Sequence, residues 1–594
     1  MRVADYVVSR IEQCGVSTVY LITGRGLLYL TDAVAANKNI NSVSMHNEQA
    51  LSYAAYAYAE QNEGIGVCMV STGCAATNAI TGVMCAWQDD VPMIVISGQH
   101  MLNETTYHTH SGIRTYRQQE NNIIDLVRPV TKYAVMVEKA EEIGSVMDEA
   151  IYKATHGRKG PVWIDIPLDI QNMRVEEDEL SHFSPAEEKK EKYDLSKVVS
   201  LLESSKRPVL LAGGGVRESG ARDELIRFVE MHEIPVVYNP AAADLYSDSN
   251  RLSIGPVGSM GGSRAGNFAM QNSDLILCIG CRLNSMLTGV VTKDYAREAT
   301  LIRVDIDEAE LNEYSFEDQV CICADAKTFL IALYSGTEGK GPDCKEWVDK
   351  CLHWKEMFPK NINVRNGSDE EIDLYEVAEA IGRNIGKKGT LISDAGIEEL
   401  VIPCATCVPD GVRVIHPFSQ GAMGFAIPAV LGVCGAGENN IVCVVGDGSI
   451  MMNLQELQTI RSYNVPAKIF VINNRGYAVI RERQTELFRR RTIGTDDSNG
   501  VFLPDFEKVA DCFSFNYCKI TDFDELDAGV KDVLGSDEAV ICEIICKEDQ
   551  PFLKNSYAVS STRKLLRRPL EDQFPFLERD VIKGEMMIEP VELE

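Results

Sequence analysis

The sequence predicts an α/β protein of three doubly wound parallel-sheet domains, in which two similar domains flank a Rossmann-like middle domain. The chain has 594 residues, which at roughly 100 to 200 residues per domain indicates about three domains. A hydrophobic fraction of 45% and a charged fraction of 25% are those of an ordinary globular protein. Short apolar runs alternate with amphipathic segments along most of the chain, which is typical of parallel sheets covered by helices on both faces.

The first domain is expected over residues 1–180. It begins with a helix from Val3 to Cys14, a strand from Thr18 to Ile22 and a turn from Thr23 to Gly26. Further helices and strands alternate up to the strand Pro161 to Ile166. Regular alternation of this kind implies a parallel sheet.

The rest of the chain divides at charge-rich and polar stretches. Glu176 to Lys192 reads as a solvated linker into a middle domain over 190–335, where the glycine turn Gly213 to Gly215 follows a strand. Such a turn is weak evidence for a nucleotide, because it serves equally as a tight connection. A third domain is expected over 370–560, and residues 561–594 form a tail.

Charge and segment patterns exclude several classes of protein. The formal net charge of −30 argues against a nucleic-acid partner, because no basic surplus replaces counterions along a phosphate backbone. The amino-terminal sequence lacks the order of charges and apolar residues found in signal peptides, and no apolar run reaches the length of a membrane span. We therefore expect a cytoplasmic protein without a membrane partner.

The 18 cysteines are scattered through apolar segments, where they act as small hydrophobic residues. This is the pattern of a reduced, cytosolic protein. Cys278 with Cys281 and Cys404 with Cys407 form two CxxC pairs, so a metal site is an alternative. The distance between the pairs and their setting disfavour zinc.

The stretch from Gly446 to Tyr477 has the most specific chemistry. An apolar run ends at Gly446-Asp447-Gly448, an amphipathic segment follows, and a second apolar run ends at Asn473-Asn474. Parallel strands bring both polar turns to one sheet edge, where open α/β sheets bind ligands. Their oxygen atoms suit a magnesium ion that also binds phosphate, and helix amino-terminal dipoles favour the same phosphates. An ordinary βαβ unit with two polar turns is the alternative.

GDG followed at this distance by NN resembles the diphosphate-binding motif of thiamine diphosphate (ThDP) enzymes. The resemblance implies that Asp447, Asn474 and the backbone carbonyl of Gly476 are magnesium ligands. It also implies cofactor contacts by the rest of the motif. These are Gly446, Gly448, Ser449 and Tyr477.

The segment His46-Asn47-Glu48-Gln49-Ala50, which opens an Ala- and Tyr-rich helix, resembles the catalytic glutamate segment of this superfamily. The resemblance implies that Glu48 holds a proton at the aminopyrimidine ring of ThDP, so that the ring can take the proton of the thiazolium carbon. Burial of the carboxyl would raise its pKa and suit that role. The alternative is a carboxylate that only interacts with the helix dipole.

Further segments resemble the acetolactate synthase branch of these enzymes. Ser71 to Ala79 and Ala86 to Pro92 resemble STGPGATNA and AWxDxxP, although Cys74 and Ala75 replace Pro and Gly. Tyr116 to Glu120 resembles a phenylalanine-glutamine-glutamate stretch. There Gln119 keeps the glutamine, with an implied catalytic role, and Gln118 replaces the phenylalanine as a candidate substrate contact. The cofactor contacts implied in this domain are Gly24, Gly26, Thr72 and Asn78.

Phe418 to Ala429 resembles the family's GxMGxxxPA stretch. By this resemblance Met423 wedges between the two rings of ThDP, and Gly421 offers its carbonyl to the pyrimidine amino group. The alternative is a buried methionine beside a helix of small residues.

Two substrate positions depart from biosynthetic acetolactate synthases. Met286 stands where those enzymes have an arginine that contacts the substrate, and Arg483 stands where they have a tryptophan that selects the second ketoacid. Arg481 and Arg483 are therefore candidate substrate contacts. The GYxxIRxxQ pattern and the tail Arg567 to Leu577 look more like acetolactate-synthase-like enzymes of surface-polysaccharide and sugar metabolism.

The resemblance implies a ThDP- and magnesium-dependent transferase that decarboxylates a 2-oxo acid, with pyruvate expected, and passes the acyl carbanion to an acceptor carbonyl. A non-oxidative decarboxylase or carbon–carbon lyase and a non-catalytic ThDP-fold protein are alternatives, and Glu48 argues against the last. The middle domain of the superfamily either binds FAD in a structural role or holds nothing. The resemblance also implies a homodimer or dimer of dimers in which Glu48 and Asp447 of different chains share a site.

Overall fold

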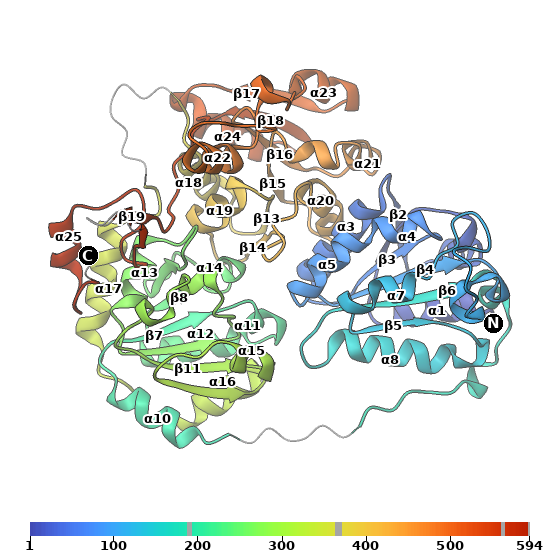
Figure 1. Cartoon of the computed structure of the whole chain (residues 1–594), viewed down its shortest axis with the longest axis horizontal. Helices are drawn as coiled ribbons and strands as arrows, with labels where there is room; N and C mark the ends of the chain where they lie inside the picture. The colour runs from blue at the N-terminus through green and yellow to red at the C-terminus, as the bar shows by residue number, and fades with distance from the viewer. Residues whose placement is uncertain (187–192, 363–370, 560–564, 592–594) are drawn as a thin grey trace.

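The computed structural model describes residues 1–186, 193–362, 371–559 and 565–591. In this part of the chain, three separate parallel sheets of six strands each are flanked by helices (Figure 1). The expected fold class is confirmed. The domain boundaries stay a prediction, and residues 187–192 of the expected linker lie outside the described residues.

The first sheet has the strand order β2-β1-β3-β4-β6-β5. Its strands are β1 (Thr18–Leu21), β2 (Asn41–Ser44), β3 (Gly66–Val70), β4 (Met93–Gln99), β5 (Tyr133–Met136) and β6 (Pro161–Pro167). The longer helices on its faces are α1 (Val3–Gln13), α2 (Leu28–Ala36), α3 (Glu48–Asn62), α5 (Ile80–Gln88) and α8 (Ile143–Thr155). Strands β3, β4 and β6 are buried throughout, as expected for a parallel sheet covered on both faces.

The second sheet has the order β12-β11-β10-β7-β8-β9. Its strands are β7 (Pro208–Ala212), β8 (Val236–Tyr238), β9 (Ser253–Pro256), β10 (Leu275–Ile279), β11 (Thr300–Asp305) and β12 (Gln319–Cys323). The longer helices around it are α10 (Leu195–Ser204), α12 (Arg222–His232), α13 (Arg264–Gln271), α16 (Ala326–Gly336) and α17 (Lys345–Met357). The chain reverses its direction across the sheet between the neighbours β7 and β10, which creates a topological switch point.

The third sheet has the order β14-β13-β15-β16-β18-β17. Its strands are β13 (Gly389–Ser393), β14 (Val412–Ile415), β15 (Ile441–Gly446), β16 (Lys468–Asn473), β17 (Asn516–Ile520) and β18 (Val540–Ile545). Its helices are α18 (Leu374–Asn384), α19 (Ile397–Ala405), α20 (Ala426–Gly435), α21 (Glu456–Ser462), α22 (Ala478–Leu487), α23 (Phe506–Phe513) and α24 (Phe523–Leu534).

The central strands of the third sheet contribute to two different hydrophobic cores. In β15, Ile441, Cys443 and Val445 belong to the core shared with the first sheet, whereas Val442 and Val444 belong to the core shared with the second. Successive side chains of a strand point to opposite faces, so one apolar run serves both cores. The third sheet therefore lies between the other two in the packing of the molecule.

Helices α3 and α20 join the first and third sheets. Every residue of α3 from Ala50 to Ala59 is buried, and α20 is buried from Ala426 to Val433. Gly432 lets the two backbones approach closely, since a Cβ there would lie 2.2 Å from the carbonyl oxygen of Ala54. The small side chains of both helices thus fix the position of Glu48, the first residue of α3, relative to the third sheet.

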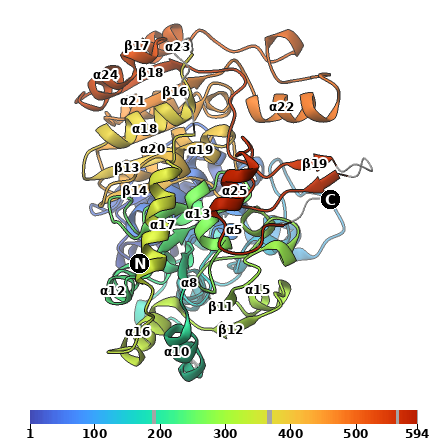
Figure 2. The ribbon, with the colours of Figure 1, turned by 90° about the vertical axis from the view of Figure 1, so that its left-hand side faces the viewer.

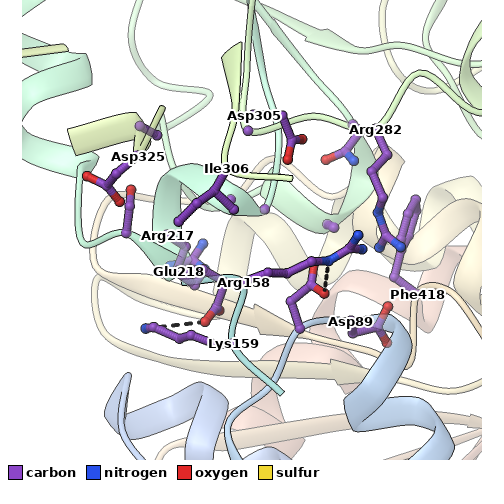
Figure 3. A pocket seen from close by; sticks show the side chains of 18 of the residues that line it. Asp89, Arg158, Lys159, Arg217, Glu218, Arg282, Asp305, Ile306, Asp325 and Phe418 are labelled. Atoms are coloured by element: carbon purple, nitrogen blue, oxygen red, sulfur yellow. Dashed lines mark hydrogen bonds and ion pairs between the residues drawn. The ribbon is translucent and has the colours of Figure 1, made fainter. Parts of the chain in front are cut away.

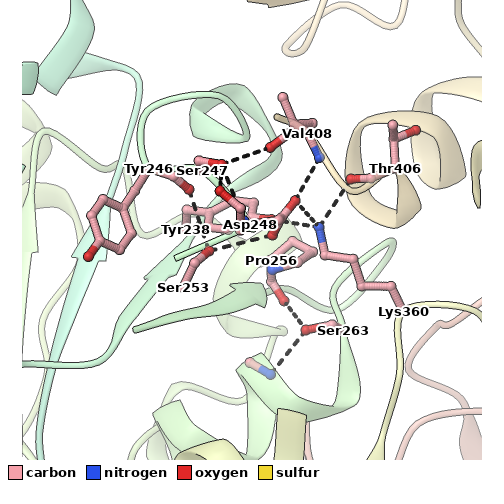
Figure 4. A network of polar contacts seen from close by, with 12 residues as sticks. Tyr238, Tyr246, Ser247, Asp248, Ser253, Pro256, Ser263, Lys360, Thr406 and Val408 are labelled. Carbon is pink, nitrogen blue, oxygen red and sulfur yellow. Dashed lines mark hydrogen bonds and ion pairs between the residues drawn. The ribbon is translucent and has the colours of Figure 1, made fainter. Parts of the chain in front are cut away.

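A buried polar network joins the middle domain to the third sheet (Figure 4). The Lys360 ammonium donates to Asp248 at 2.7 Å, to the Tyr238 hydroxyl at 2.9 Å and to the Thr406 carbonyl at 3.2 Å. Asp248 also accepts from the backbone N–H of Val408 at 3.0 Å. Because the charged groups are paired and hydrogen-bonded, their burial is tolerated and the domain junction is well defined.

The tail returns to the middle domain. The hairpin of β19 (Tyr557–Val559) and β20 (Leu565–Arg567) precedes α25 (Arg579–Glu585), which lies near α13 and α17 (Figure 2). Glu585 accepts from Lys350 at 2.7 Å and from the Trp354 indole at 2.9 Å.

No helix in the described ranges combines the length and apolar character needed to cross a membrane.

One expected element begins later than the sequence pattern suggested. After Gly446-Asp447-Gly448 the chain forms a short 3₁₀ turn, Ile450–Met452, and the regular helix α21 begins only at Glu456. The first N–H groups after the turn therefore belong to irregular backbone rather than to the start of an α-helix.

Candidate active site

The two polar turns meet at the carboxyl edge of the third sheet. Strands β15 and β16 are neighbours, and Gly446 is in register with Ile472. The backbone N–H of Asp447 donates to the carbonyl of Ile472 at 3.0 Å, and its carboxylate accepts from the N–H of Gly476 at 3.1 Å. The structure thus brings Asp447, Asn474 and Gly476 together.

Asp447 and Asn474 are both buried. Burial raises the pKa of Asp447 to about 7, although backbone N–H groups of Gly476, Gly448 and Arg475 oppose that shift. The amide oxygen of Asn474 is buried without a hydrogen-bond partner in the described structure. A buried acceptor without a donor is costly, so a ligand or cation that paired with this oxygen would stabilise the turn.

Gly448 is required by the packing of the turn. A Cβ atom at this position would lie 2.3 Å from the ring of Tyr477. Only glycine allows the Tyr477 ring to cover the first turn, so the two ends of the motif are in direct contact.

Ser449 connects the turn to two other loops. Its hydroxyl donates to Asp394 at 2.5 Å and accepts from the N–H of Gly424 at 3.0 Å. Asp394 follows β13 and is completely buried; its carboxylate also accepts from the N–H groups of Gly424 and Ala426. Asp394 therefore holds the loop that carries Gly421 and Met423 against the Asp447 turn.

Gly421 and Met423 lie in that loop just before α20, and both are half-buried. Gly421 has a φ of +52°, which favours glycine. A Cβ added to Gly421 would lie 2.9 Å from a carboxyl oxygen of Glu399, so this carboxyl is immediately beside the Gly421 backbone.

Glu48 begins α3 and is half-buried. The side chain of Asn47 caps the helix, and one carboxyl oxygen of Glu48 accepts from the amide of Asn78 at 3.0 Å. The neighbouring Gln49 accepts from Asn453 at 3.2 Å, and His46 donates its N–H to Glu456 at 3.0 Å. The start of α3 therefore contacts the segment after the Asp447 turn, but Glu48 makes no hydrogen bond to Asp447 or Asn474 in the described structure.

The other candidates of the first domain surround the ends of β3 and β4. The N–H of Gly26 donates to Ser71 at 3.3 Å, and the hydroxyl of Thr72 donates to the carbonyl of Gly98 at 3.0 Å. Gly24 lies against the Ser71 side chain. These contacts hold the loops together, and the Thr72 hydroxyl is already used within the domain.

Gln118 and Gln119 lie in an exposed loop. The carbonyl of Gln118 contacts the His100 ring at 2.9 Å, and the amide of Gln119 lies 3.7 Å from the sulfur of Cys74. The loop thus places Gln119 beside the segment that includes Asn78.

Comparisons with known proteins identify the family of each domain. Three family models match: the thiamine pyrophosphate enzyme N-terminal TPP binding domain over residues 1–125, the central domain over 195–333 and the C-terminal TPP binding domain over 406–544.

Several full-length relatives are also similar. The acetolactate synthase large subunit of Haemophilus influenzae is 31% identical over 541 residues, which cover 89% of this chain and 91% of that protein. The large subunit of Lactococcus lactis is 29% identical, with 93% of each chain covered. Acetolactate synthase 2, chloroplastic, of Zea mays is 29% identical over 93% of this chain and 86% of its own.

The chain belongs to the thiamine diphosphate enzymes, in the acetolactate synthase-like branch. It is thus a ThDP-dependent enzyme, and the expectation from its motifs is confirmed. The individual site residues stay predictions.

The residues of the Asp447 turn fit the group that such enzymes bind. A buried carboxylate and an amide oxygen without a partner among the described residues are hard oxygen donors of the kind that magnesium prefers. The described residues contain no cluster of three or more His, Cys, Asp or Glu side chains suited to a metal. The expected magnesium ligands, Asp447, Asn474 and Gly476, include one carboxylate, so they form a different kind of metal site from such a cluster.

Two cavities adjoin this region. The first, of about 130 Å³, lies at the carboxyl ends of β7, β10 and β11, at the topological switch point. Figure 3 shows Arg282 and Phe418 on one side of it, with Asp89 nearby. The second, of about 460 Å³, shares Arg282 and Phe418 with the first and extends to Gly421.

Arg481 and Arg483 have different environments. Arg481 donates to the carbonyl of Asn474 at 3.1 Å and to that of Glu548, so it supports the turn that carries the expected metal ligands. Arg483 is exposed, and its ion-pair partner among the described residues is Glu486, at 3.4 Å.

The sequence patterns missed Asp394 and Glu399. Asp394 follows a strand in the same way as Asp447 does, which was a usable signal. Glu399 had no such signal, because only folding places α19 beside the Gly421 loop.

Proposed function

We propose that this enzyme depends on ThDP and magnesium, decarboxylates a 2-oxo acid, with pyruvate as the first candidate, and couples the acyl unit to an acceptor carbonyl. The buried, unpartnered amide oxygen of Asn474 beside Asp447 carries this proposal, because it marks a site for a cation and its diphosphate. ThDP, when bound, supplies an electron sink at its thiazolium carbon. Asp447 and Asn474 would hold magnesium, and Glu48 would hold the proton at the pyrimidine ring.

The second cavity supports an acceptor other than a second small 2-oxo acid. Gln88, Asn284 and Gln420 line it with amide groups that can bind hydroxyls, and Met286 contributes no charge. We propose a hydroxylated carbonyl compound, as in sugar or surface-polysaccharide metabolism.

A direct assay tests the reaction. The pure protein is incubated with ThDP, magnesium and labelled pyruvate, with and without candidate ketones, aldehydes and keto-sugars. Release of CO₂ together with a labelled coupling product supports the proposal. Release of CO₂ with only the free aldehyde would instead indicate a decarboxylase, and no release from any 2-oxo acid would contradict the proposal.

The first cavity suits a nucleotide, and FAD is the candidate. Open α/β sheets bind ligands at the switch point, and the glycine turn after β7 lines the cavity there. Arg158 and Arg217 also line it, but both are paired with carboxylates, Arg158 with Asp90 and Arg217 with Asp244. A flavin absorption spectrum of the purified protein would support FAD, and its absence after incubation with FAD would contradict it.

We also propose a homodimer or dimer of dimers. Among the described residues Glu48 makes no hydrogen bond to Asp447, whereas the proposed chemistry needs both at one cofactor. The first domain exposes Leu28, Met101 and Ile113, which a partner chain would cover.

A further inference from the structure

The second cavity is lined by one carboxyl, that of Glu399, which no described residue neutralises. Glu399 is the third residue of α19 and lines this cavity, where Met260, Met286 and Leu400 supply apolar surface. Among the described residues, Glu399 has neither a hydrogen-bond partner nor an ion pair. Its carboxyl lies beside Gly421, so it is at the end of the cavity nearest the expected cofactor.

Both burial and nearby charges disfavour the ionised form of Glu399. Burial is the main cause that raises its pKa, to about 8, and the neighbouring carboxylates of Asp89 and Asp394 add to the shift. Arg282 lines the same cavity, but its guanidinium donates to the Ser419 hydroxyl at 3.1 Å. At neutral pH Glu399 is therefore mainly a neutral acid with an O–H donor facing the cavity.

Glu398, which precedes Glu399 in α19, faces a different part of the site. The carboxyl of Glu398 lies against Gly446, 3.0 Å from where a Cβ of that glycine would be. The two adjacent glutamates thus face different parts of the site, Glu398 the Asp447 turn and Glu399 the acceptor cavity.

We propose that Glu399 is a further catalytic residue that donates a proton to the oxygen of the acceptor carbonyl. This inference rests on the proposed function. As the new carbon–carbon bond forms at the acceptor carbonyl carbon, the π electrons of that carbonyl move to its oxygen, which takes the proton of Glu399. The carboxylate then regains a proton from water. The protons of the overall reaction balance, because coupling consumes one proton for each CO₂ released from a 2-oxo acid anion.

The test compares Glu399→Gln with Glu399→Asp and with Glu346→Gln, which changes an exposed glutamate on α17. The glutamine is isosteric but cannot transfer a proton. Circular dichroism first establishes that each variant is folded. In the cofactor-free protein, the infrared difference between wild type and Glu399→Gln should contain a protonated-carboxyl band that disappears as the pH rises through about 8. Glu346→Gln should keep that band, and its presence in Glu399→Gln would overturn the proposal.

The second readout is the partition of products. Glu399→Gln should release CO₂ at nearly the wild-type rate but form about 100-fold less coupled product, because general acid catalysis is worth about that factor. Glu399→Asp should recover part of the coupling. Equal loss of CO₂ release and coupling, or unchanged coupling, would overturn the role of Glu399. Failure of the wild type to release CO₂ from any 2-oxo acid would overturn the proposed function itself, and this role with it.

Discussion

Asn474 shows at the scale of one residue how the site depends on a ligand. Its buried amide oxygen has no donor within the described structure, which costs about 1–3 kcal/mol if it stays unpaired. Asp447 beside it is buried and has a raised pKa. Both features are unfavourable for folding alone, and a cation bound by these oxygens would offset that cost.

Replacing Glu48 by Gln should leave ThDP and magnesium bound but suppress turnover by about 10² to 10⁴-fold, because only the proton at the pyrimidine ring is lost. Exchange of the thiazolium proton, followed by NMR after acid quench, measures this step. Unchanged exchange in the variant would exclude Glu48 from the role.

Replacing Asp447 by Ala should lower the affinity for magnesium and ThDP, because the single carboxylate of the expected metal site is removed. Calorimetric titration at several magnesium concentrations should show partial recovery at high magnesium. The matched control is Asp524→Ala, an exposed aspartate of the same domain, which should bind as the wild type does. Tight, magnesium-independent binding by Asp447→Ala would move the metal site elsewhere.

At the scale of elements, ion pairs help to hold α22, whose partly buried Val479 also packs against the second hydrophobic core. None of its residues is buried, although it directly follows Tyr477. The buried ammonium of Lys554 contacts Glu482 at 2.7 Å and Glu486 at 3.0 Å, and the Lys554 backbone pairs with Phe574 of the tail. Lys554 therefore connects α22 to the carboxy-terminal segment.

Lys554→Met should loosen α22 with little effect on the three sheets, because the methionine keeps the apolar contacts and removes both ion pairs. Hydrogen–deuterium exchange should become severalfold faster in 478–487 and stay unchanged in β15 and β16. Arg483→Met is the control, since Arg483 has only a weak contact on the same helix. Equal exchange in both variants would show that Lys554 does not hold α22.

At the scale of the whole molecule, charged side chains from all three domains meet beside the first cavity. Glu60 comes from α3, Glu218 from the middle domain and Arg413 from β14. Burial raises the pKa of Glu60 to about 7 and that of Glu218 to about 8, with Arg217 and Lys159 opposing the shifts. Both values lie above the ordinary glutamate range.

This junction should weaken as the pH rises to about 8. A raised carboxyl pKa in the folded state means that the stability it contributes is present below the unfolded pKa and is lost as pH rises through about 7 to 8. The melting temperature of the wild type should therefore fall between about pH 5 and 8, and that of Glu60→Gln should fall less. Parallel curves for both proteins would contradict the shift at Glu60.

The assembly prediction uses two inactive variants. If sites form between chains, mixing Glu48→Gln with Asp447→Ala and allowing subunit exchange should restore activity, because a mixed dimer contains one intact site. Each variant alone, taken through the same exchange, is the control. Sites built within single chains would stay inactive in every mixture.

The sequence by itself determined the strands and the chemistry at their ends. The apolar run before Asp447 and the run before Asn474 are continuous, because strands buried on both faces need apolar side chains at every position. Local patterns of this kind, together with short motifs of fixed spacing, were enough to predict the fold class and the ThDP family. Glu48 was singled out in the same way, from the helix that it begins.

Only the tertiary structure decided what surrounds these motifs. Asp394 joins the Asp447 turn to the Gly424 loop, and Arg481 supports the Asn474 turn. Glu399 lies beside Gly421 and has no partner in the part of the chain that the structure describes. These contacts join segments that are far apart in the sequence, and no periodic pattern or motif relates one segment to the other. Their geometry depends on how the helices pack on the third sheet, so the environment of each charge is known only once the chain is folded.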